Sequence, residues 1–469
     1  MKPRIIFTVM LMIGVFGAPV PASASAFASE IIPTISPSVI LVEQVSGKVL
    51  YAKNEHARMY PASMTKILTS LVALDYLDID QVLTVGQEIV GLPADYATNL
   101  HVIGETITVR NLIRALIIRS GNETGCVIAL NAVRVKENRQ NIPYVDAERT
   151  FCELMNEKAR SLGALHSNFD NTYGFHSNNH YTTAYDLSII CRAYMKNDSL
   201  RQIAGEREYV GDSLGGIAHD GAKVLQYNWA NHNRLLQAGD YYYPYATGIK
   251  TGFTDQAGDC LASAAQKNGI ELVAVVFNSK DPGRWQDSQM LFEYGFENFA
   301  YETIHRQGDT LEKMPVSNPR LEDDGFVELL FGEDAAHFMS KAEHARLERK
   351  VHYNEELLSE DEPDAFVAPI EEGATLGAVT YKLDGETVFE GTLVAAHEVI
   401  AKSYDSDMDY YIATFKERVF SKSAFPYWFG AAGFAFGVAG FTVAIAGRRR
   451  APRDRWRVSQ NFGRYGGYR

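Results

Sequence analysis

An uncharged stretch near the carboxyl end constrains this 469-residue chain most strongly. Residues 423–447 contain no charged side chain, and a helix of that length, at ~1.5 Å per residue, crosses a bilayer core of ~30 Å. Aromatic residues gather at its start and three arginines follow its end, as the positive-inside rule expects. We therefore predict a transmembrane helix over 423–447 and a basic cytoplasmic tail over 448–469. A buried soluble helix is the alternative, although the arginine-rich tail argues against it.

The amino-terminal end carries the pattern of an export signal. Lys2 and Arg4 precede an uncharged apolar stretch over residues 5–20, and small residues at 22–26 offer a cleavage site. We predict a signal peptide over 1–26. A retained amino-terminal membrane helix is the alternative, but the apolar core is short for a span. The residues between the signal and the anchor are then extracytoplasmic, and the protein is bound to the cell membrane by a single pass.

The exported part of the chain is strongly acidic. The formal net charge is −13, of which the tail contributes +7 and the signal +2, so the residues between them carry −22. Such a surface repels phosphate backbones, and nucleic acid is therefore excluded as a partner. Four cysteines are too few for a disulfide scaffold, and although three pairings are possible we expect mostly free, buried thiols. They are Cys126, Cys152, Cys191 and Cys260.

Strand and helix patterns predict one sheet interrupted by a helical insert. Residues 38–54 are typical of a β-hairpin, and residues 245–278 hold three further strands, which a helix over 284–299 follows. The patterns between 61 and 236 are mainly helical. We expect one antiparallel sheet built from the hairpin and the later strands. This first domain is predicted over residues 27–300.

The next part of the chain changes character. Short strands with turn signals, including Asp384-Gly385, predict a small all-β domain over 301–400. The acidic run over 355–364 is interpreted as a solvated loop. A juxtamembrane linker over 401–422 is expected to join this domain to the anchor.

Ser63 and Lys66 lie three residues apart at the start of an apolar helical run, so they share one face of the helix. A serine hydroxyl is a poor nucleophile unless a nearby base takes its proton, and an uncharged lysine one turn away is such a base. Free lysine has a pKa of ~10.4, so the uncharged form requires burial and a second cation, for which Lys250 is the candidate. The pattern predicts Ser63 as nucleophile and Lys66 as general base. A helix cap beside a solvated lysine is the alternative.

Two further triplets follow in order, Ser120-Gly121-Asn122 and Lys250-Thr251-Gly252. With their surroundings, PASMTKILT, LIIRSGNETG and GIKTGFTDQAGDCLASA, they resemble D-alanyl-D-alanine carboxypeptidases of the low-molecular-mass penicillin-binding protein class. The resemblance extends over roughly residues 38–400. It implies an α/β (α+β) transpeptidase-like domain, an antiparallel sheet with helices and a helical insert, followed by the small all-β domain. It also implies a reaction without a metal or cofactor.

The resemblance assigns roles around the reacting carbonyl. The backbone amides of Ser63, at a helix amino terminus, and of Phe253 form the oxyanion hole. Ser120 relays a proton to the departing D-alanine, and Asn122 hydrogen-bonds the peptide being cut.

A substrate that ends in a free carboxylate calls for cations and hydroxyl donors. Lys250 and Thr251 provide them, and Arg284 resembles an additional arginine of the family, with a plain surface arginine as the alternative. The catalytic set is thus Ser63, Lys66 and Ser120, and the substrate-binding set is Asn122, Lys250, Thr251, Gly252, Phe253 and Arg284.

These assignments predict an enzyme that removes the terminal D-alanine from peptidoglycan stem pentapeptides through an acyl-enzyme on Ser63. β-Lactam antibiotics are expected to acylate the same serine. A serine β-lactamase shares the three motifs, but no E-x-x-L-N-like segment lies between Ser120 and Lys250. A catalytically silent wall-binding protein is the second alternative. His176 and His180 lack the intervening glutamate of a zinc-protease helix, so no metal site is predicted.

Overall fold

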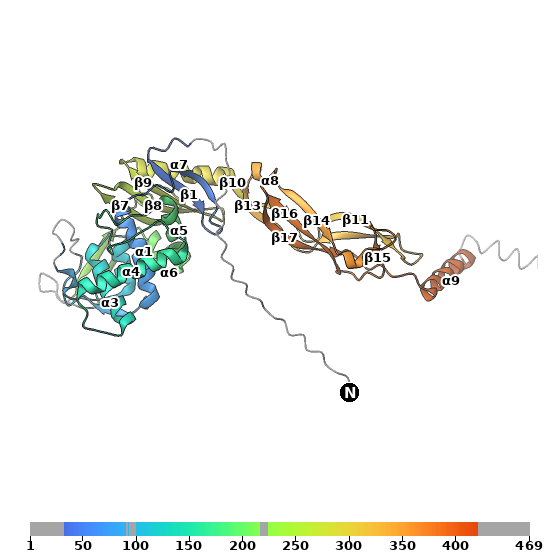
Figure 1. Cartoon of the computed structure of the whole chain (residues 1–469), viewed down its shortest axis with the longest axis horizontal. Helices are drawn as coiled ribbons and strands as arrows, with labels where there is room; N and C mark the ends of the chain where they lie inside the picture. Colours follow the sequence, from blue (N-terminus) through green and yellow to red (C-terminus); the bar gives the residue numbers. More distant parts are fainter. Residues whose placement is uncertain (1–31, 91, 93–99, 216–223, 421–469) are drawn as a thin grey trace, which may run out of the picture. The chain divides into compact units, whose positions relative to one another are not determined.

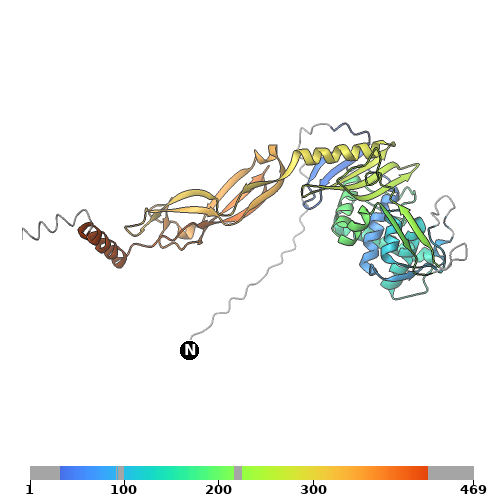
Figure 2. The ribbon, with the colours of Figure 1, turned by 180° about the vertical axis from the view of Figure 1, so that it is seen from behind.

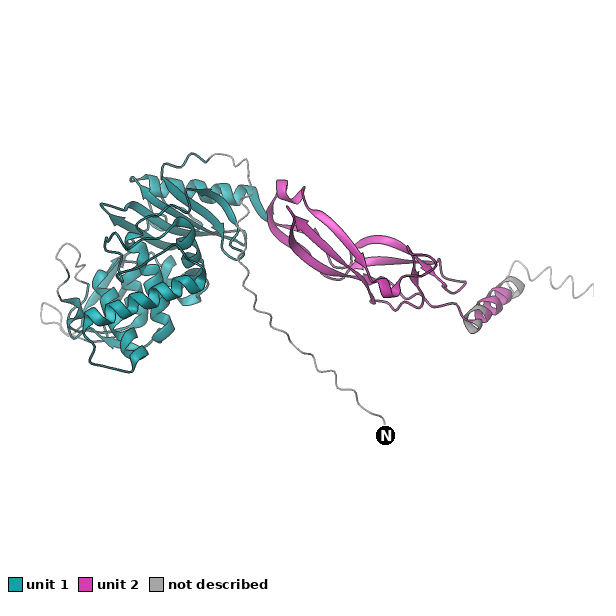
Figure 3. Cartoon of the chain, viewed as in Figure 1, with its two compact units in different colours: residues 1–300 teal, residues 301–469 magenta. Residues whose placement is uncertain are grey.

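The computed structural model describes residues 32–90, 92, 100–215 and 224–420. The predicted signal peptide over 1–26, transmembrane helix over 423–447 and tail over 448–469 lie outside these residues. Contacts divide the chain into two compact units, unit 1 over Met1–Ala300 and unit 2 over Tyr301–Arg469 (Figure 3).

Unit 1 is built on a five-stranded antiparallel sheet whose strand order is β2-β1-β9-β8-β7. Its strands are β1 (Ser38–Glu43), β2 (Val49–Lys53), β7 (Ala246–Thr254), β8 (Gly258–Lys267) and β9 (Ile270–Ser279). The amino-terminal hairpin joins the later strands along β1 and β9, where Ile40 lies opposite Val275. Both residues are fully buried, so the pairing lies in the core. The prediction of one sheet formed from two distant segments is confirmed.

Helices cover both faces of this sheet. The helix α7 (Gly283–Asn298) packs on β8 and β9, while α5 (Ala184–Met195) packs on β1 and β9 from the opposite face (Figure 1). Figure 2 shows the same layers from behind, with the helical insert on the α5 side. This is a mixed α/β transpeptidase-like domain, as predicted.

The helical insert surrounds α1 (Thr65–Tyr76), which packs against α5 and against other helices of the insert. Residues 65–73 are all buried, so α1 is the centre of the insert rather than a surface helix. The other helices of the insert are α2 (Val109–Ile117), α3 (Asn122–Glu137), α4 (Tyr144–Leu162) and α6 (Asp198–Gly205). The short elements are η1 (Ala62–Met64), η2 (Gln87–Ile89), β3 (Val82–Thr84), β4 (Thr106–Thr108), β5 (Glu208–Asp212) and β6 (Gln226–Ala230).

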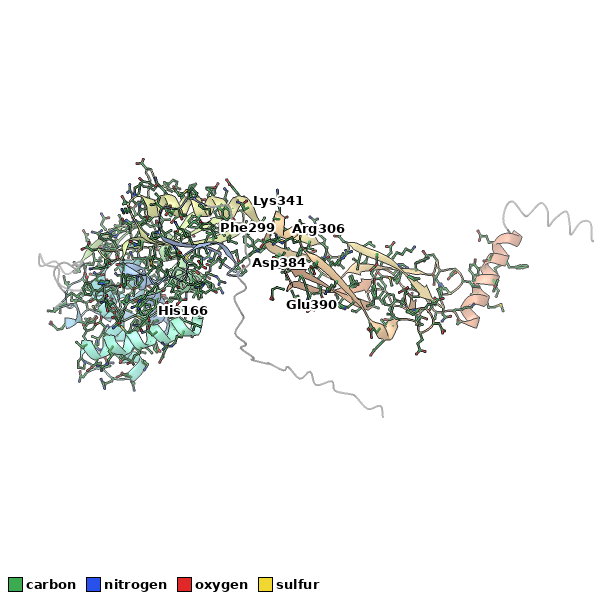
Figure 4. All side chains as sticks on the ribbon, turned by 45° about the horizontal axis from the view of Figure 1, so that its top comes forward. His166, Phe299, Arg306, Lys341, Asp384 and Glu390 are labelled. Atoms are coloured by element: carbon green, nitrogen blue, oxygen red, sulfur yellow. The ribbon has the colours of Figure 1, made fainter. Side chains whose placement is uncertain are left out.

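Unit 2 is a β domain with a six-stranded sheet in the order β14-β16-β17-β12-β11-β15. Asp384 and Gly385, both with positive φ, form the tight turn between β16 and β17, as the sequence predicts (Figure 4). The acidic run over 355–364 is largely exposed, but its first three residues form the short helix η3 (Glu355–Leu357). The strands are β10 (Phe299–His305), β11 (Thr310–Ser317), β12 (Phe326–Phe331), β13 (Ala335–Ser340), β14 (Glu348–Tyr353), β15 (Phe366–Val367), β16 (Thr375–Leu383) and β17 (Glu386–Ala395), with the helix α8 (Lys341–His344).

Most of the predicted linker over 401–422 is helical, as α9 (Tyr404–Phe420). Among the residues that the structure describes, no helix combines the length and the apolar character that a membrane span requires. The four cysteines are buried and unpaired, which confirms the expectation of free thiols.

Candidate active site

The nucleophile motif lies where the helical insert meets the edge of the sheet. Ser63 is half-buried in η1, which leads into α1 and packs against β7. The approach of β7 requires glycine, because a Cβ atom on Gly252 would lie 2.8 Å from the carbonyl oxygen of Pro61. Two motifs that are almost 190 residues apart in the sequence are thereby brought into contact.

Lys66 lies inside the protein with its amine directed at Ser63. Its Nζ is 2.9 Å from Ser63 Oγ, 2.7 Å from Asn122 Oδ1 and 2.7 Å from the carbonyl oxygen of Tyr173. An uncharged amine has two N–H donors and one lone pair. The amide and carbonyl oxygens accept the two donors, so the lone pair is left for the Ser63 hydroxyl, which then donates to Nζ. These four groups form the geometry of a serine activated by a neutral lysine.

The electrostatics favour that uncharged form. Lys66 is fully buried, and burial followed by the nearby charge of Lys250 holds the pKa of its amine well below the usual value. Lys250 is itself 1% exposed, and burial together with Arg284 lowers its pKa to about 7. Near neutral pH Lys250 is therefore partly charged in the free site, and a bound carboxylate would favour its protonated form.

The second motif forms the turn from α2 into α3. Ser120 has a φ of +65° and precedes Asn122, the first residue of α3, whose side chain binds Lys66. Ser120 lines a cavity of about 530 Å³ together with Ser63. Within the described residues no hydrogen bond joins the Ser120 hydroxyl to Ser63 or Lys66. The structure thus places Ser120 in the site but not in the hydrogen bonds around the amine.

The same cavity gathers the predicted carboxylate ligands. Thr251 and Arg284 line it, as does Phe253, the predicted oxyanion donor, and Lys250 lies buried with its Nζ 3.4 Å from Thr251 Oγ1. Arg284 Nη1 pairs with Asp259 Oδ1 at 2.9 Å, and its side chain is 16% exposed. The guanidinium is therefore held in place at the cavity wall, which argues against a plain surface arginine. A second cavity of about 350 Å³ extends from Ser63 along Phe253 and residues 173–176.

Sequence reasoning missed several groups of this site. The Tyr173 carbonyl is a backbone atom, and Asp259 acts through Arg284, so neither has a side-chain motif of its own. Arg119 and His232 also line the larger cavity, where Arg119 Nη1 donates to His232 Nε2 at 2.7 Å. Burial, followed by Lys250, lowers the pKa of His232 to about 4. The available signal was the resemblance itself, since Arg119 lies in LIIRSGNETG, Asp259 lies in GIKTGFTDQAGDCLASA, and Tyr173 lies within the matching range of roughly 38–400.

Comparison with known families decides what this site belongs to. The family model described as D-alanyl-D-alanine carboxypeptidase, the S11 peptidases, matches residues 26–281, more than half of the chain. The chain belongs to this family. It is therefore a serine-type D-Ala-D-Ala carboxypeptidase, a hydrolase. A second model, the C-terminal domain of penicillin-binding protein 5, matches residues 299–401 of this carboxypeptidase.

Individual relatives of this carboxypeptidase carry the same description. The D-alanyl-D-alanine carboxypeptidase DacF of Bacillus subtilis is 27% identical over 369 residues, covering 77% of this chain and 85% of its own. DacC of Escherichia coli is 27% identical over 392 residues, covering 80% and 88%. Penicillin-binding protein 5 of Haemophilus influenzae shares the fold with a TM-score of 0.54 at 24% identity, covering 79% of this chain and 99% of that chain.

Proposed function

We propose that Ser63 is the nucleophile of this carboxypeptidase and that Lys66 is its general base. The observation that carries the proposal is the buried Lys66 amine, 2.9 Å from Ser63 Oγ, with both of its N–H donors already engaged. Lys66 takes the hydroxyl proton as Ser63 Oγ bonds to the carbonyl carbon of the penultimate D-alanine. The amides of Ser63 and Phe253 stabilise the oxyanion.

Collapse of the tetrahedral intermediate breaks the peptide bond and releases D-alanine. Lys66 gives the proton it took to the amino group of the leaving D-alanine, with Ser120 as the relay, and Asn122 holds the acyl side of the substrate. Water then attacks the ester on Ser63 while Lys66 takes a proton from that water. Lys66 returns this proton to Ser63 Oγ as the ester bond breaks, so the enzyme ends the cycle unchanged.

Selectivity for a free carboxyl terminus comes from the cationic wall of the larger cavity. Lys250, the hydroxyl of Thr251 and Arg284 bind the terminal carboxylate, and Asp259 holds Arg284 in the orientation needed for that contact. Gly252 keeps this strand close to Ser63. The substrates are the stem pentapeptides of bacterial peptidoglycan, and β-lactams occupy the same site as covalent inhibitors.

The order of the predicted segments along the sequence supports an enzyme anchored at the outer side of a bacterial cell membrane. We assign a signal peptide to 1–26, the peptidase domain to 27–300, the small β domain to 301–400 and the juxtamembrane segment to 401–422. A single transmembrane helix over 423–447 and a cytoplasmic tail over 448–469 complete the assignment, on the charge pattern of the sequence.

The test is mass spectrometry of the full chain in detergent after exposure to benzylpenicillin, with D-alanine release from a pentapeptide measured in parallel. We expect one penicilloyl adduct on Ser63 that persists for minutes, steady D-alanine release, and neither result with Ser63→Ala. An adduct on another residue would refute the site assignment. Release of the penicilloyl group within seconds would instead indicate a β-lactamase.

A further inference from the structure

Three hydrogen-bonded polar side chains near the nucleophile have no part in the reaction described above: Thr65, His180 and Asp170, of which Asp170 is 32% exposed. His180 Nε2 lies 2.7 Å from Thr65 Oγ1, and His180 Nδ1 lies 3.0 Å from Asp170 Oδ1. Thr65 is fully buried and His180 is 2% exposed, so neither reaches solvent or substrate. The Asp-His-Thr order resembles a nucleophilic triad, but the burial of Thr65 rules out attack on a substrate. Any effect of these three residues on the reaction must therefore pass through the groups that Thr65 contacts.

Thr65 touches the peptide that carries the proposed oxyanion donor. Its Oγ1 lies 2.8 Å from the carbonyl oxygen of Ala62. The peptide unit is planar, so a group that fixes this carbonyl also fixes the direction of the Ser63 N–H in the same unit. Ala62 needs such support, because it has a φ of +47°, which residues with a Cβ atom rarely adopt.

The same peptide is held from its other side by the segment that precedes His180. A Cβ atom on Gly174 would lie 1.8 Å from the Ala62 carbonyl oxygen and 2.9 Å from the Ser63 nitrogen, so the Gly174 backbone packs directly on this unit. Asn171 Oδ1 accepts hydrogen bonds from the backbone N–H of Gly174 at 2.8 Å. Asp170 and His180 therefore lie at the two ends of a segment that encloses the Ala62–Ser63 peptide.

We propose that Asp170, His180 and Thr65 are positioning residues that orient the Ala62–Ser63 peptide, so that the Ser63 N–H points at the developing oxyanion. The inference rests on the proposed function, in which that N–H is an oxyanion donor. His180 stays uncharged in this role. Burial lowers its pKa, and the hydrogen bond with Asp170 offsets this only in part. Because the Thr65 hydroxyl donates to the Ala62 carbonyl, the neutral imidazole donates its Nε2–H to Thr65 Oγ1. Its Nδ1 then accepts the backbone N–H of Asp170 at 3.1 Å, so His180 still bridges Asp170 and Thr65.

The first test compares Thr65→Val, which keeps the shape but loses the hydroxyl, with Thr65→Ser, which keeps the hydroxyl. Stopped-flow acylation by a fluorescent penicillin gives both the dissociation constant of the initial complex and the acylation rate constant. Removing an oxyanion donor costs about 10²–10³ in rate, and a misaligned donor should cost less, so we expect Thr65→Val to lower the acylation rate constant about tenfold. The dissociation constant should hardly change, and Thr65→Ser should restore the rate.

The second test asks whether His180 acts through Thr65. His180→Leu should slow acylation in the same way. The double variant, Thr65→Val with His180→Leu, should be no slower than the slower single variant, because both substitutions remove the same support of the Ala62–Ser63 peptide. His305→Leu is the matched control, since it removes a buried, doubly hydrogen-bonded histidine from unit 2 and should leave acylation unchanged. If His180→Leu does not fold, the acylation rate constants of Thr65→Val and Thr65→Ser decide whether the inference holds.

Two results would overturn the inference. The first is a folded Thr65→Val chain that is acylated at the wild-type rate, or one that only binds more weakly. The second is full additivity in the double variant. A wild-type chain that takes no adduct would refute the proposed function, and this inference would fall with it.

Discussion

Both units bury titratable groups with structural roles, but among the described residues only unit 1 buries lysine amines. In unit 2 the buried examples are structural: His305 bonds Tyr381 and a backbone carbonyl, and Glu343 closes the capping box of α8. In unit 1 the amines of Lys66 and Lys250 are buried at the edge of cavities that open to solvent. Burying an amine disfavours folding, because its charge must be removed or compensated. The difference teaches that unit 1 retains an unfavourable burial of two amines, which the proposed reaction at Ser63 would explain.

The backbone shows the same contrast. Positive φ values outside glycine in unit 2 occur at Asn318 and Asp384, residue types that tolerate the left-handed region in turns. In unit 1 they occur also at Ala62 and Ser120, each adjacent to or within a catalytic motif. Alanine and serine gain little there, so strain is concentrated at the site. Substitutions that remove a feature of the site should therefore reduce activity far more than matched changes in unit 2.

The largest effect should come from Lys66→Met, which keeps the volume of the side chain and removes the base. Loss of a general base typically costs 10²–10⁴ in rate, so we expect acylation by penicillin to fall about a thousandfold. Lys313→Met in unit 2, which removes an exposed pair with Asp324 and a contact with the Phe326 ring, is the control and should leave the rate unchanged. Stopped-flow acylation measures both chains.

The midpoint of thermal unfolding should be recorded for each variant, since slow acylation by an unfolded variant would not test the role of Lys66 as the base. A folded Lys66→Met chain that is acylated within a few fold of the wild-type rate would break the comparison, because the buried amine would then be structural.

A smaller effect is expected from two arginines that each pair with an aspartate. Arg284→Gln removes a cation from the cavity wall, and hydrogen bonds to charged groups contribute ~1.5–3 kcal/mol, so KM for a pentapeptide should rise about tenfold or more. Arg346→Gln removes the exposed pair with Asp384 in unit 2 and should change neither KM nor kcat. Steady-state D-alanine release measures both constants.

A substrate with an amidated carboxyl terminus sharpens this result. Arg284→Gln should alter its turnover much less than that of the free acid. Equal losses for the two substrates would mean that Arg284 supports the cavity wall rather than the carboxylate.

Much of the fold follows from patterns that the sequence displays locally. The β1–β2 hairpin, the three strands around residues 246–279 and the Asp384-Gly385 turn each depend on short-range periodicity or turn chemistry. The central place of α1 was harder to predict. Its apolar periodicity suggests one buried face, but all nine residues over 65–73 are buried, because helices far along the chain cover its other sides.

The site was predictable where one of the three motifs contains the side chain that acts. It was hidden where the backbone acts, and at Arg119, His232 and Asp259, which lie outside those motifs. Ser63, Lys66, Asn122 and the strand around Lys250 are brought together as the motifs require. The Tyr173 carbonyl carries no side-chain signature, because any residue at that position offers the same oxygen. The positive φ of Ala62 is equally invisible, since alanine is compatible with an ordinary helix start and the contacts of this peptide with Thr65 and Gly174 arise only in the folded chain.

The smallest effect concerns stability and pH at Lys250. Burial lowers the pKa of Lys250 to about 7 in the folded chain, against ~10.4 for a free lysine. Above the folded value the unfolded chain holds a proton that the folded chain lacks, so the free energy of unfolding rises with pH, by up to ~1.4 kcal/mol per pH unit for one such group. Lys250→Met should remove this contribution to the pH dependence of the free energy of unfolding between about pH 7 and 8, and Lys313→Met should not.

Urea unfolding of wild type, Lys250→Met and Lys313→Met at several pH values measures this dependence. The same dependence in wild type and Lys250→Met would show that the amine keeps its proton when buried. In that case the charge of Lys250 would be balanced within unit 1, and the contrast with the surface pairs of unit 2 would rest on Lys66 alone.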